Sequence, residues 1–409
     1  MTAPSRPFAA VRRLHQLLWA GFAIVVTAFN LRTAVTGFTP LLEIIGSDLA
    51  FGVMLAGLLG TIPAAAFGVF GFLAPAVTKR FGLERTAAVA LAMTALSLVL
   101  RAFAPNSAVL ILSTVLALAG IGAANVVVVP LVKAWFADRL ALWTSLYLIL
   151  MQTGQFLAPL IAVPLAVGAT WRVSVGMWAA PAAVAAVAWF VLAITLPADG
   201  HHVVAAAATT ERAPTIARSS TVWGLMVLFA MLSLSNYAII TWLPSVLTDA
   251  GGSAELGGTM VALYSAWGMV AALVVPQLAT RMANPFIVVV ICAIALIVGY
   301  VGLLLSPVAG TLAWVCALGI GVSTFPLCMT LINRRTRTSQ TASAVSGFVQ
   351  GIGYAIACVG PIGLGLLHEA TGSWTIPLLV LAATTVPGLV AGWFACRPRF
   401  VEDAAPTTR

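Results

Sequence analysis

Long apolar runs, separated by short polar, charged or Pro/Gly-rich segments, dominate the hydrophobic pattern of this chain. Each run approaches or exceeds the roughly 20 residues that a helix needs to cross the hydrocarbon core of a bilayer. Only helices and closed barrels satisfy their backbone hydrogen bonds internally in that core. The pattern therefore predicts an all-α membrane protein with twelve transmembrane helices. The predicted helices cover residues 15–40, 52–78, 86–104, 108–132, 142–166, 172–196, 221–246, 257–279, 286–305, 311–333, 340–367 and 374–396.

A polar stretch rich in Ala and Thr, residues 198–220, is longer than the other connections and separates six runs from six. The two halves also resemble each other: Ala-Leu-Ala-Gly-Ile-Gly at 117–122 is echoed by Ala-Leu-Gly-Ile-Gly at 317–321. Such internal repeats are typical of transporters that bind their substrate between two related halves. We therefore predict two pseudo-symmetric six-helix bundles, 1–197 and 221–409, joined by a cytoplasmic linker over 198–220.

Composition and charge support the membrane assignment. The chain is 61% hydrophobic and 8% charged, whereas soluble domains carry roughly 25% charged residues. The formal net charge of +9 does not indicate nucleic-acid binding, because most of the 20 basic residues stand in short clusters between apolar runs on alternate sides. The positive-inside rule then places both termini in the cytoplasm, with Arg101 and Arg172 in outer segments. We expect a monomeric, multi-pass protein of the bacterial inner membrane, with the lipid bilayer and a small-molecule substrate as its partners.

No residue pattern indicates an enzyme, a metal site or a bound cofactor. The five cysteines lie in apolar segments without CxxC spacing, and the four histidines match no ligand pattern. The sequence contains no Walker-type phosphate loop, GxSxG elbow or HExxH motif, so neither ATP hydrolysis in this chain nor ester or peptide hydrolysis is indicated.

Arg32 is the basic residue that lies well inside a predicted helix, and no acidic residue falls near the middle of any span. A charge at that depth costs about 2.5–3.5 kcal/mol on insertion scales, so it needs a compensating partner. One interpretation is that a bound anion supplies the counter-charge. The alternative is structural: helix carbonyls, water or an inward-bent Glu43 satisfy the guanidinium.

Other polar side chains occur at comparable depth in several spans, which predicts a polar cavity near the midplane. The alternative for each is an interhelical hydrogen bond, typically worth about 0.6 kcal/mol. Trp242 and Pro244 are assigned to the interfacial aromatic belt instead of the site. The predicted substrate-binding residues are Arg32, Asn30, Thr36, Asn125, Tyr147, Gln152, Asn236, Tyr237, Tyr264, Gln350 and Tyr354.

Two six-helix halves, a central linker and a basic loop after the second span resemble the major facilitator superfamily. Within it, several segments are similar to the cyanate/2-nitroimidazole transporter family. These are Asn30-Leu31-Arg32 with Thr36 and Pro40-Leu41-Leu42, Gly120-Ile121-Gly122 with Asn125 and Pro130, Thr241-Trp242-Leu243-Pro244, and Ser346-Gly347-Phe348-Val349-Gln350 through Gly353-Tyr354 to Gly360-Pro361.

The chain departs from the family pattern at two places. After Gly71-Phe72-Leu73-Ala74 it has Pro75 where the superfamily usually has an aspartate, so the gating salt bridge of that aspartate is not expected. Thr33 stands where the first-span motif commonly continues with proline, which affects the expected kink beside Arg32.

The resemblance implies secondary transport of a small anion or compact nitrogen-containing solute by alternating access. An efflux carrier for small uncharged drugs, such as nitroimidazoles, is the alternative function. Efflux pumps for cationic drugs commonly use a membrane-embedded acid, and this sequence shows none near a midplane. For the same reason, any proton coupling has to use the substrate or a peripheral group. A sensor or a channel fits the duplicated plan and the short tails less well.

Overall fold

The computed structural model describes residues 6–195 and 219–404. All regular secondary structure in these ranges is helical, and twelve helical segments are long and apolar enough to cross a membrane. The prediction of a multi-pass, all-α protein with twelve spans is therefore confirmed. The predicted linker lies almost entirely outside the described residues, so the domain boundaries around it stay a prediction.

The helices before the linker are called the N-terminal set, and those after it the C-terminal set. The N-terminal set comprises α1 (Arg6–Thr36), η1 (Thr39–Leu41), α2 (Leu42–Leu49), α3 (Val53–Phe81), α4 (Leu83–Ala102), α5 (Ser107–Trp135), η2 (Ala137–Arg139), α6 (Leu140–Gly168), α7 (Trp171–Gly176) and α8 (Ala179–Thr195). The C-terminal set comprises α10 (Ser220–Asp249), α11 (Ala254–Arg281), α12 (Phe286–Leu305), α13 (Thr311–Gly321), α14 (Thr324–Arg334), α15 (Ser339–Ala357), α16 (Val359–Thr371), α17 (Thr375–Cys396) and η4 (Val401–Ala404).

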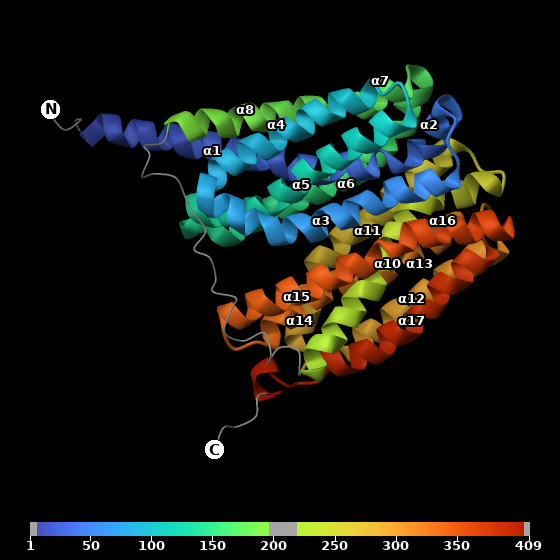
Figure 1. The fold of residues 1–409 in the computed structure, drawn as a ribbon. Helices are drawn as coiled ribbons and strands as arrows, with labels where there is room; N and C mark the ends of the chain where they lie inside the picture. Colours follow the sequence, from blue (N-terminus) through green and yellow to red (C-terminus); the bar gives the residue numbers. More distant parts are fainter. Residues whose placement is uncertain (1–5, 196–218, 405–409) are drawn as a thin grey trace.

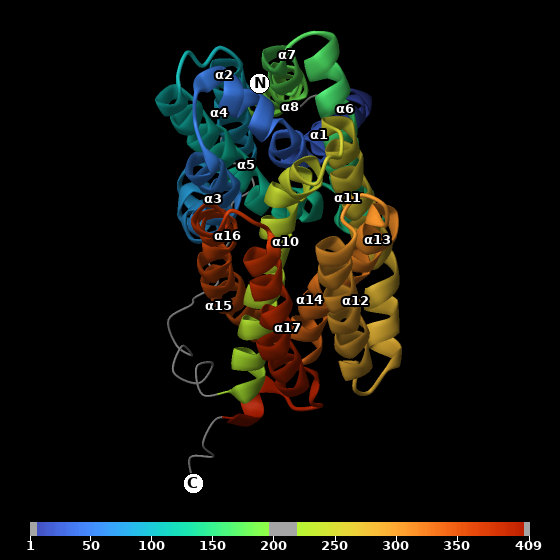
Figure 2. The same cartoon turned by 90° about the vertical axis from the view of Figure 1, so that its right-hand side faces the viewer.

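Each set packs mainly on itself, as Figure 2 shows. In the N-terminal set α4 packs on α5 and α8, and α1 packs on α6; in the C-terminal set α10 packs on α15 and α17. The two sets meet where α6 contacts α11 and where α3 contacts α15 and α16. Helix α1 begins and helix α17 ends on the same side of the molecule (Figure 1), which we call the terminal end.

Three predicted spans, 311–333, 340–367 and 172–196, are each divided into two helices. The first is interrupted at Val322 and Ser323, between Gly321 and a helix that carries Pro326 in its first turn. Proline has no backbone N–H to donate, so a break in the hydrogen-bond ladder just before it costs little. This break matters for the site because it brings Val322, Phe325 and Pro326 to the surface between the two sets.

A glycine fixes the distance between α1 and α6, the two N-terminal helices that contribute to the site. A Cβ atom on Gly154 would lie 2.1 Å from the backbone oxygen of Phe29 and 3.2 Å from the Thr33 methyl group. Any larger residue would therefore push the helices apart. Small residues at such crossings let membrane helices approach closely.

Arg101, predicted to lie in an outer segment, is buried at the end of a helix. It lies in the last turn of α4 and is only 1% exposed. Both terminal nitrogens of its guanidinium donate to the backbone oxygen of Ala34, at 3.3 Å each, and the group lies 4.4 Å from the centre of the Phe38 ring. A cation near the end of α1 satisfies a carbonyl that has no partner within the helix and complements the helix dipole.

The sequence departure at Pro75 stays a prediction. Helix α3 continues through this segment, but the side chains of Gly71, Phe72, Ala74 and Pro75 lie outside the part that the structure describes.

Candidate functional site

A cavity of about 330 Å³ lies between the two sets, with walls from α1, α6, α10, α11, α14 and α15. Its volume is at the lower end of the range of about 300–1,000 Å³ typical of ligand sites. Apolar side chains form much of the lining, and Arg32 is its charged residue. The polar side chains that line it are Arg32, Thr36, Gln152, Gln155, Ser233, Asn236, Tyr237, Thr330, Asn333 and Tyr354.

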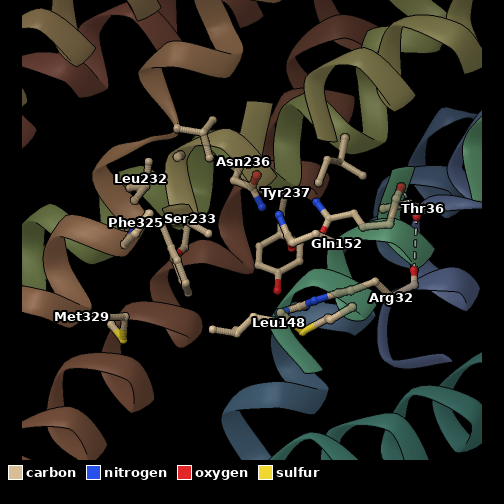
Figure 3. A pocket seen from close by; sticks show the side chains of 18 of the residues that line it. Arg32, Thr36, Leu148, Gln152, Leu232, Ser233, Asn236, Tyr237, Phe325 and Met329 are labelled. Atoms are coloured by element: carbon tan, nitrogen blue, oxygen red, sulfur yellow. Dashed lines mark hydrogen bonds between the residues drawn. The ribbon is translucent and has the colours of Figure 1, made fainter. Parts of the chain in front are cut away.

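The structure brings six of the eleven predicted residues to this cavity. They come from four helices that are far apart in the sequence, and Figure 3 shows several of their side chains converging. The six are Arg32, Thr36, Gln152, Asn236, Tyr237 and Tyr354. The other five do not belong to the lining: Asn30, Asn125, Tyr147, Tyr264 and Gln350.

Arg32 has no carboxylate partner among the described residues. The ion pairs that the structure records involve other groups. Its guanidinium lies 4.7 Å from the centre of the Phe67 ring and faces the Tyr237 hydroxyl (Figure 3). Its buried Nε has no hydrogen-bond partner in the part of the chain that the structure describes. Glu43, the acid that could have bent inward, instead accepts a 2.7 Å hydrogen bond from Thr248.

Thr36 connects the turn of α1 that carries Arg32 to helix α6 of the same set. Its hydroxyl lies within hydrogen-bond distance of two backbone oxygens, that of Arg32 at 3.2 Å and that of Gln155 at 3.1 Å. One of these bonds is the dashed line in Figure 3. The hydroxyl thus bridges α1 and α6, and helps to hold the arginine-bearing turn against α6.

Asn236 presents an oriented amide to the cavity. The hydroxyl of Tyr264, which is 3% exposed, donates to Asn236 Oδ1 at 3.2 Å. With its oxygen held in this way, the amide offers its NH₂ group to the cavity. Tyr264 is therefore placed behind the lining, as a residue that positions Asn236.

Gln152 lies where α6 meets α11, so it touches both sets. Its Nε2 would be 2.9 Å from a Cβ atom on Gly268. A side chain at 268 would displace this amide from its present position. The contact places a hydrogen-bond donor of the cavity directly at the junction between the sets.

Four aromatic rings form a wall beside the arginine. The Tyr354 ring centre lies 6.3 Å from that of Tyr237, 6.2 Å from that of Phe67 and 5.1 Å from that of Phe229. Such separations lie within the range of favourable aromatic pairs. The wall limits the water around the guanidinium and so strengthens its electrostatic interactions.

Two of the predicted residues instead make local or packing hydrogen bonds. Asn30 is fully buried and donates to the backbone oxygen of Trp178 at 3.3 Å. It is two positions from Arg32, which turns it to the opposite side of the helix. Gln350 donates to Ser346 Oγ at 2.6 Å, one turn away on its own helix. Asn125 and Tyr147 are partly buried outside the lining.

Sequence reasoning missed four polar residues of the lining. Gln155 follows Gln152 by one turn, and Ser233 precedes Asn236 and Tyr237 by one turn, so helical periodicity could have identified both. Thr330 and Asn333 lie on α14 close to the terminal end. They were not predicted, because they stand near the end of an apolar run and the predicted residues lie near the middle of theirs.

The two sets pack tightly at the end opposite the termini. Trp242 is 4% exposed and its Nε1 donates to the backbone oxygen of Pro361 at 2.7 Å. A Cβ atom on Gly57 would lie 3.0 Å from that same oxygen and 3.2 Å from the Trp242 ring. The assignment of Trp242 to the lipid interface was therefore wrong, because its ring fills the junction between α3, α10 and α16.

Further contacts between the sets support this closure. The Thr61 hydroxyl donates to the backbone oxygen of Cys358 at 3.1 Å, and Thr248 donates to Glu43. In the other direction the cavity lining reaches Asn333, next to the last residue of α14. The cavity therefore extends toward the terminal end and is closed at the opposite one.

The profile of the Major Facilitator Superfamily matches residues 21–358. A Bacillus subtilis (strain 168) protein, the uncharacterized transporter YycB, is 31% identical over 94% of this chain and 95% of its own length. The 2-nitroimidazole transporter of Escherichia coli (strain K12) is 30% identical over 94% of this chain and 97% of its own length. The cyanate transport protein CynX of the same strain is 27% identical over 86% of this chain and 90% of its own length.

Among solved structures, a point mutant of the nucleoside transporter NupG resembles this fold with a TM-score of 0.72. The alignment covers 91% of this chain and 99% of that one, with 13% sequence identity. Such identity shows a shared fold only. The twelve spans, the cavity between two helix sets and these full-length similarities agree: this chain is a transporter that belongs to the major facilitator superfamily, in the group of the cyanate and 2-nitroimidazole transporters.

Proposed function

We propose that this protein moves a small anion, or a compact cyanate-like solute, across the inner membrane by alternating access, with Arg32 as the charge that binds it. The observation that carries the proposal is the position of Arg32 in the central cavity, without a carboxylate partner among the described residues. A partly buried charge without a counter-ion is costly, and an anion in the cavity would offset that cost.

The surrounding donors fit the same chemistry. A guanidinium can meet a planar anion with two parallel hydrogen bonds. The amide of Asn236 and the amide of Gln152 add neutral donors from opposite sets. An anion held by all three groups would connect the two halves, so its binding can favour one arrangement of the halves over another.

The distribution of basic residues supports a cytoplasmic location of both termini. In that orientation the described state has its cavity directed to the cytoplasm and its outer end closed around Trp242. Alternating access would open the contacts of Trp242, Thr61 and Thr248 while the terminal end closes. The protein would carry out this cycle as a monomer, since the cavity needs residues of one chain only.

The alternative is efflux of small uncharged drugs such as nitroimidazoles. The aromatic and apolar wall of the cavity favours it, because Tyr354, Phe325 and Met329 offer stacking and dispersion contacts to a neutral ring. The 2-nitroimidazole transporter of Escherichia coli is similar over nearly the whole chain. In this case Arg32 would orient a nitro group instead of neutralising a net charge.

A ligand-dependent thermal shift separates the two proposals. Purified protein is heated with cyanate, nitrate and small carboxylates, and in parallel with neutral 2-nitroimidazole. A ligand at about 100 times its Kd adds about 2.7 kcal/mol to the stability of the folded state. Stabilisation by small anions supports the anion carrier. Stabilisation by the neutral ring alone contradicts the anion carrier and supports the drug carrier.

A further inference from the structure

A second groove, of about 750 Å³, lies on the outer surface of the N-terminal set. Helices α3, α4, α5 and α8 line it, and none of its lining residues belongs to the central cavity. Its walls are apolar except for Arg85 and Thr86. Val89, Phe190 and Ile194 are 69%, 59% and 64% exposed, so no other described part of the chain covers them.

The groove has the position and length of an inner-leaflet lipid chain. Most of its residues come from the last turns of α3 and α8 and the first turns of α4, at the terminal end, while Phe70, Met93 and Ala123 lie deeper along their helices. From Arg85 to Met93 the rise of α4 is about 12 Å at 1.5 Å per residue. Half of a bilayer core is about 15 Å thick. The groove therefore runs from the membrane surface to near the midplane.

Arg85 stands at the surface end of this groove and is exposed. It forms no ion pair with any carboxylate among the described residues. The neighbouring Glu84 is turned inward, where it accepts a hydrogen bond from Trp135 Nε1 at 3.1 Å. Thr86 uses its hydroxyl on the backbone oxygen of Gly82, at 2.6 Å, so Arg85 is the polar group available at the mouth.

Two further basic residues, Lys79 and Arg80, belong to the last turn of α3 at the same end. Basic groups near the surface of the inner leaflet attract anionic lipids, at about 1 kcal/mol for each group. Arginine adds a planar fork that matches a phosphate. The apolar walls require a long hydrocarbon chain, and the charge at the mouth requires an anion at its end.

We propose that this groove binds an anionic phospholipid of the bilayer, with one acyl chain along α4 and the headgroup phosphate on Arg85. The site is independent of the transported solute, because it shares no residue with the central cavity. It lies against α3, which also contacts α15 and α16 of the opposite set. A bound lipid would therefore brace a helix that takes part in the junction between the halves.

Native mass spectrometry of the full-length protein, titrated with phosphatidylglycerol or phosphatidylcholine of matched chains, tests the proposal. We expect the first phosphatidylglycerol to bind more tightly than the first phosphatidylcholine. Arg85→Ala should weaken phosphatidylglycerol binding by about fivefold or more, the equivalent of about 1 kcal/mol. The matched control is Arg281→Ala, which removes an exposed arginine at the end of α11 outside the groove and should leave binding unchanged.

A substitution that fills the groove with a large side chain gives a second test of lipid binding, one that does not depend on charge. Val89→Trp places a large ring in the groove at an exposed position, and should weaken both lipids while the melting temperature of the lipid-free protein changes little. Glycerol 3-phosphate, which carries the phosphate without chains, should not displace the lipid. The proposal is overturned if the two lipids bind equally, if Arg85→Ala and Arg281→Ala behave alike, or if glycerol 3-phosphate competes as well as the lipid does.

Discussion

Arg101 is buried and Arg32 is partly buried in the N-terminal set, and both lie over a phenylalanine ring, yet their surroundings differ. Arg101 donates twice to the last turn of α1 and is sealed between helices. Arg32 faces a cavity and a neutral tyrosine hydroxyl. Neither forms an ion pair among the described residues. The difference shows that burial of an arginine does not by itself indicate a binding site; the direction of its donors does.

The largest expected effect comes from removing the charge in the cavity. Arg32→Ala should abolish uptake of an anionic substrate into proteoliposomes, because no other lining residue is charged. Losing even one hydrogen bond to a charged group costs about 1.5–3 kcal/mol, or about 10- to 150-fold in affinity. Arg32→Lys should recover part of the affinity, since an ammonium keeps the charge but loses the planar fork.

The melting temperature of the empty protein completes this test. Removal of a partly buried charge that has no carboxylate partner should leave this temperature unchanged or raise it. Unaltered anion affinity in Arg32→Ala, or a collapse of its stability without ligand, would show that Arg32 resembles Arg101 and serves the structure instead.

The second prediction concerns Arg101, where we expect a loss of stability without a loss of anion affinity. Arg101→Met should lower stability by about 1–3 kcal/mol, because the Ala34 carbonyl loses both of its donors in a buried place. Anion affinity of the folded fraction should not change. Denaturation and binding measured on the same preparation check both parts.

Arg172→Met is the matched control for that prediction. Arg172 pairs with Asp48 at 2.7 Å, but the two side chains are 39% and 45% exposed. Exposed pairs contribute about 0–1 kcal/mol. Equal destabilisation by Arg101→Met and Arg172→Met would contradict the structural role assigned to Arg101.

The smallest effect is expected from two glutamines at comparable depth. Gln152→Ala removes a donor from the cavity and should weaken binding by about 2- to 10-fold, the worth of one neutral hydrogen bond of about 0.5–1.5 kcal/mol. Gln350→Ala removes only the local bond to Ser346 and should leave affinity unchanged. Isothermal titration with the ligand found by thermal shift measures the affinity of both variants. A larger loss of affinity in Gln350→Ala than in Gln152→Ala would contradict the assignment of Gln152 to the site.

The depth of a polar residue in its predicted span is a partial guide to whether it lines the cavity. Arg32, Thr36, Gln152, Asn236, Tyr237 and Tyr354 reach the cavity, whereas Asn30 and Gln350 find partners elsewhere. The distinction depends on which side of each helix faces the centre. Nearly every side of these helices is apolar, so the periodicity that marks the buried face of a soluble helix is weak here.

The pattern of apolar runs alone determined that the chain has twelve membrane spans, because a bilayer imposes one length and one secondary structure on each crossing. The internal repeat and motifs such as Asn30-Leu31-Arg32 were enough to recognise the family. These features are local in the sequence, so no knowledge of packing was needed to read them.

Only the tertiary structure decided which groups meet. Trp242 packs in the junction between the sets, Arg101 donates to a backbone oxygen at the end of α1, and Tyr264 donates to Asn236 from behind the lining. Each of these roles depends on the rotation and separation of helices that are distant in the sequence. Those quantities are set by close packing at residues such as Gly57 and Gly154, where a single added carbon would change the distance between helices.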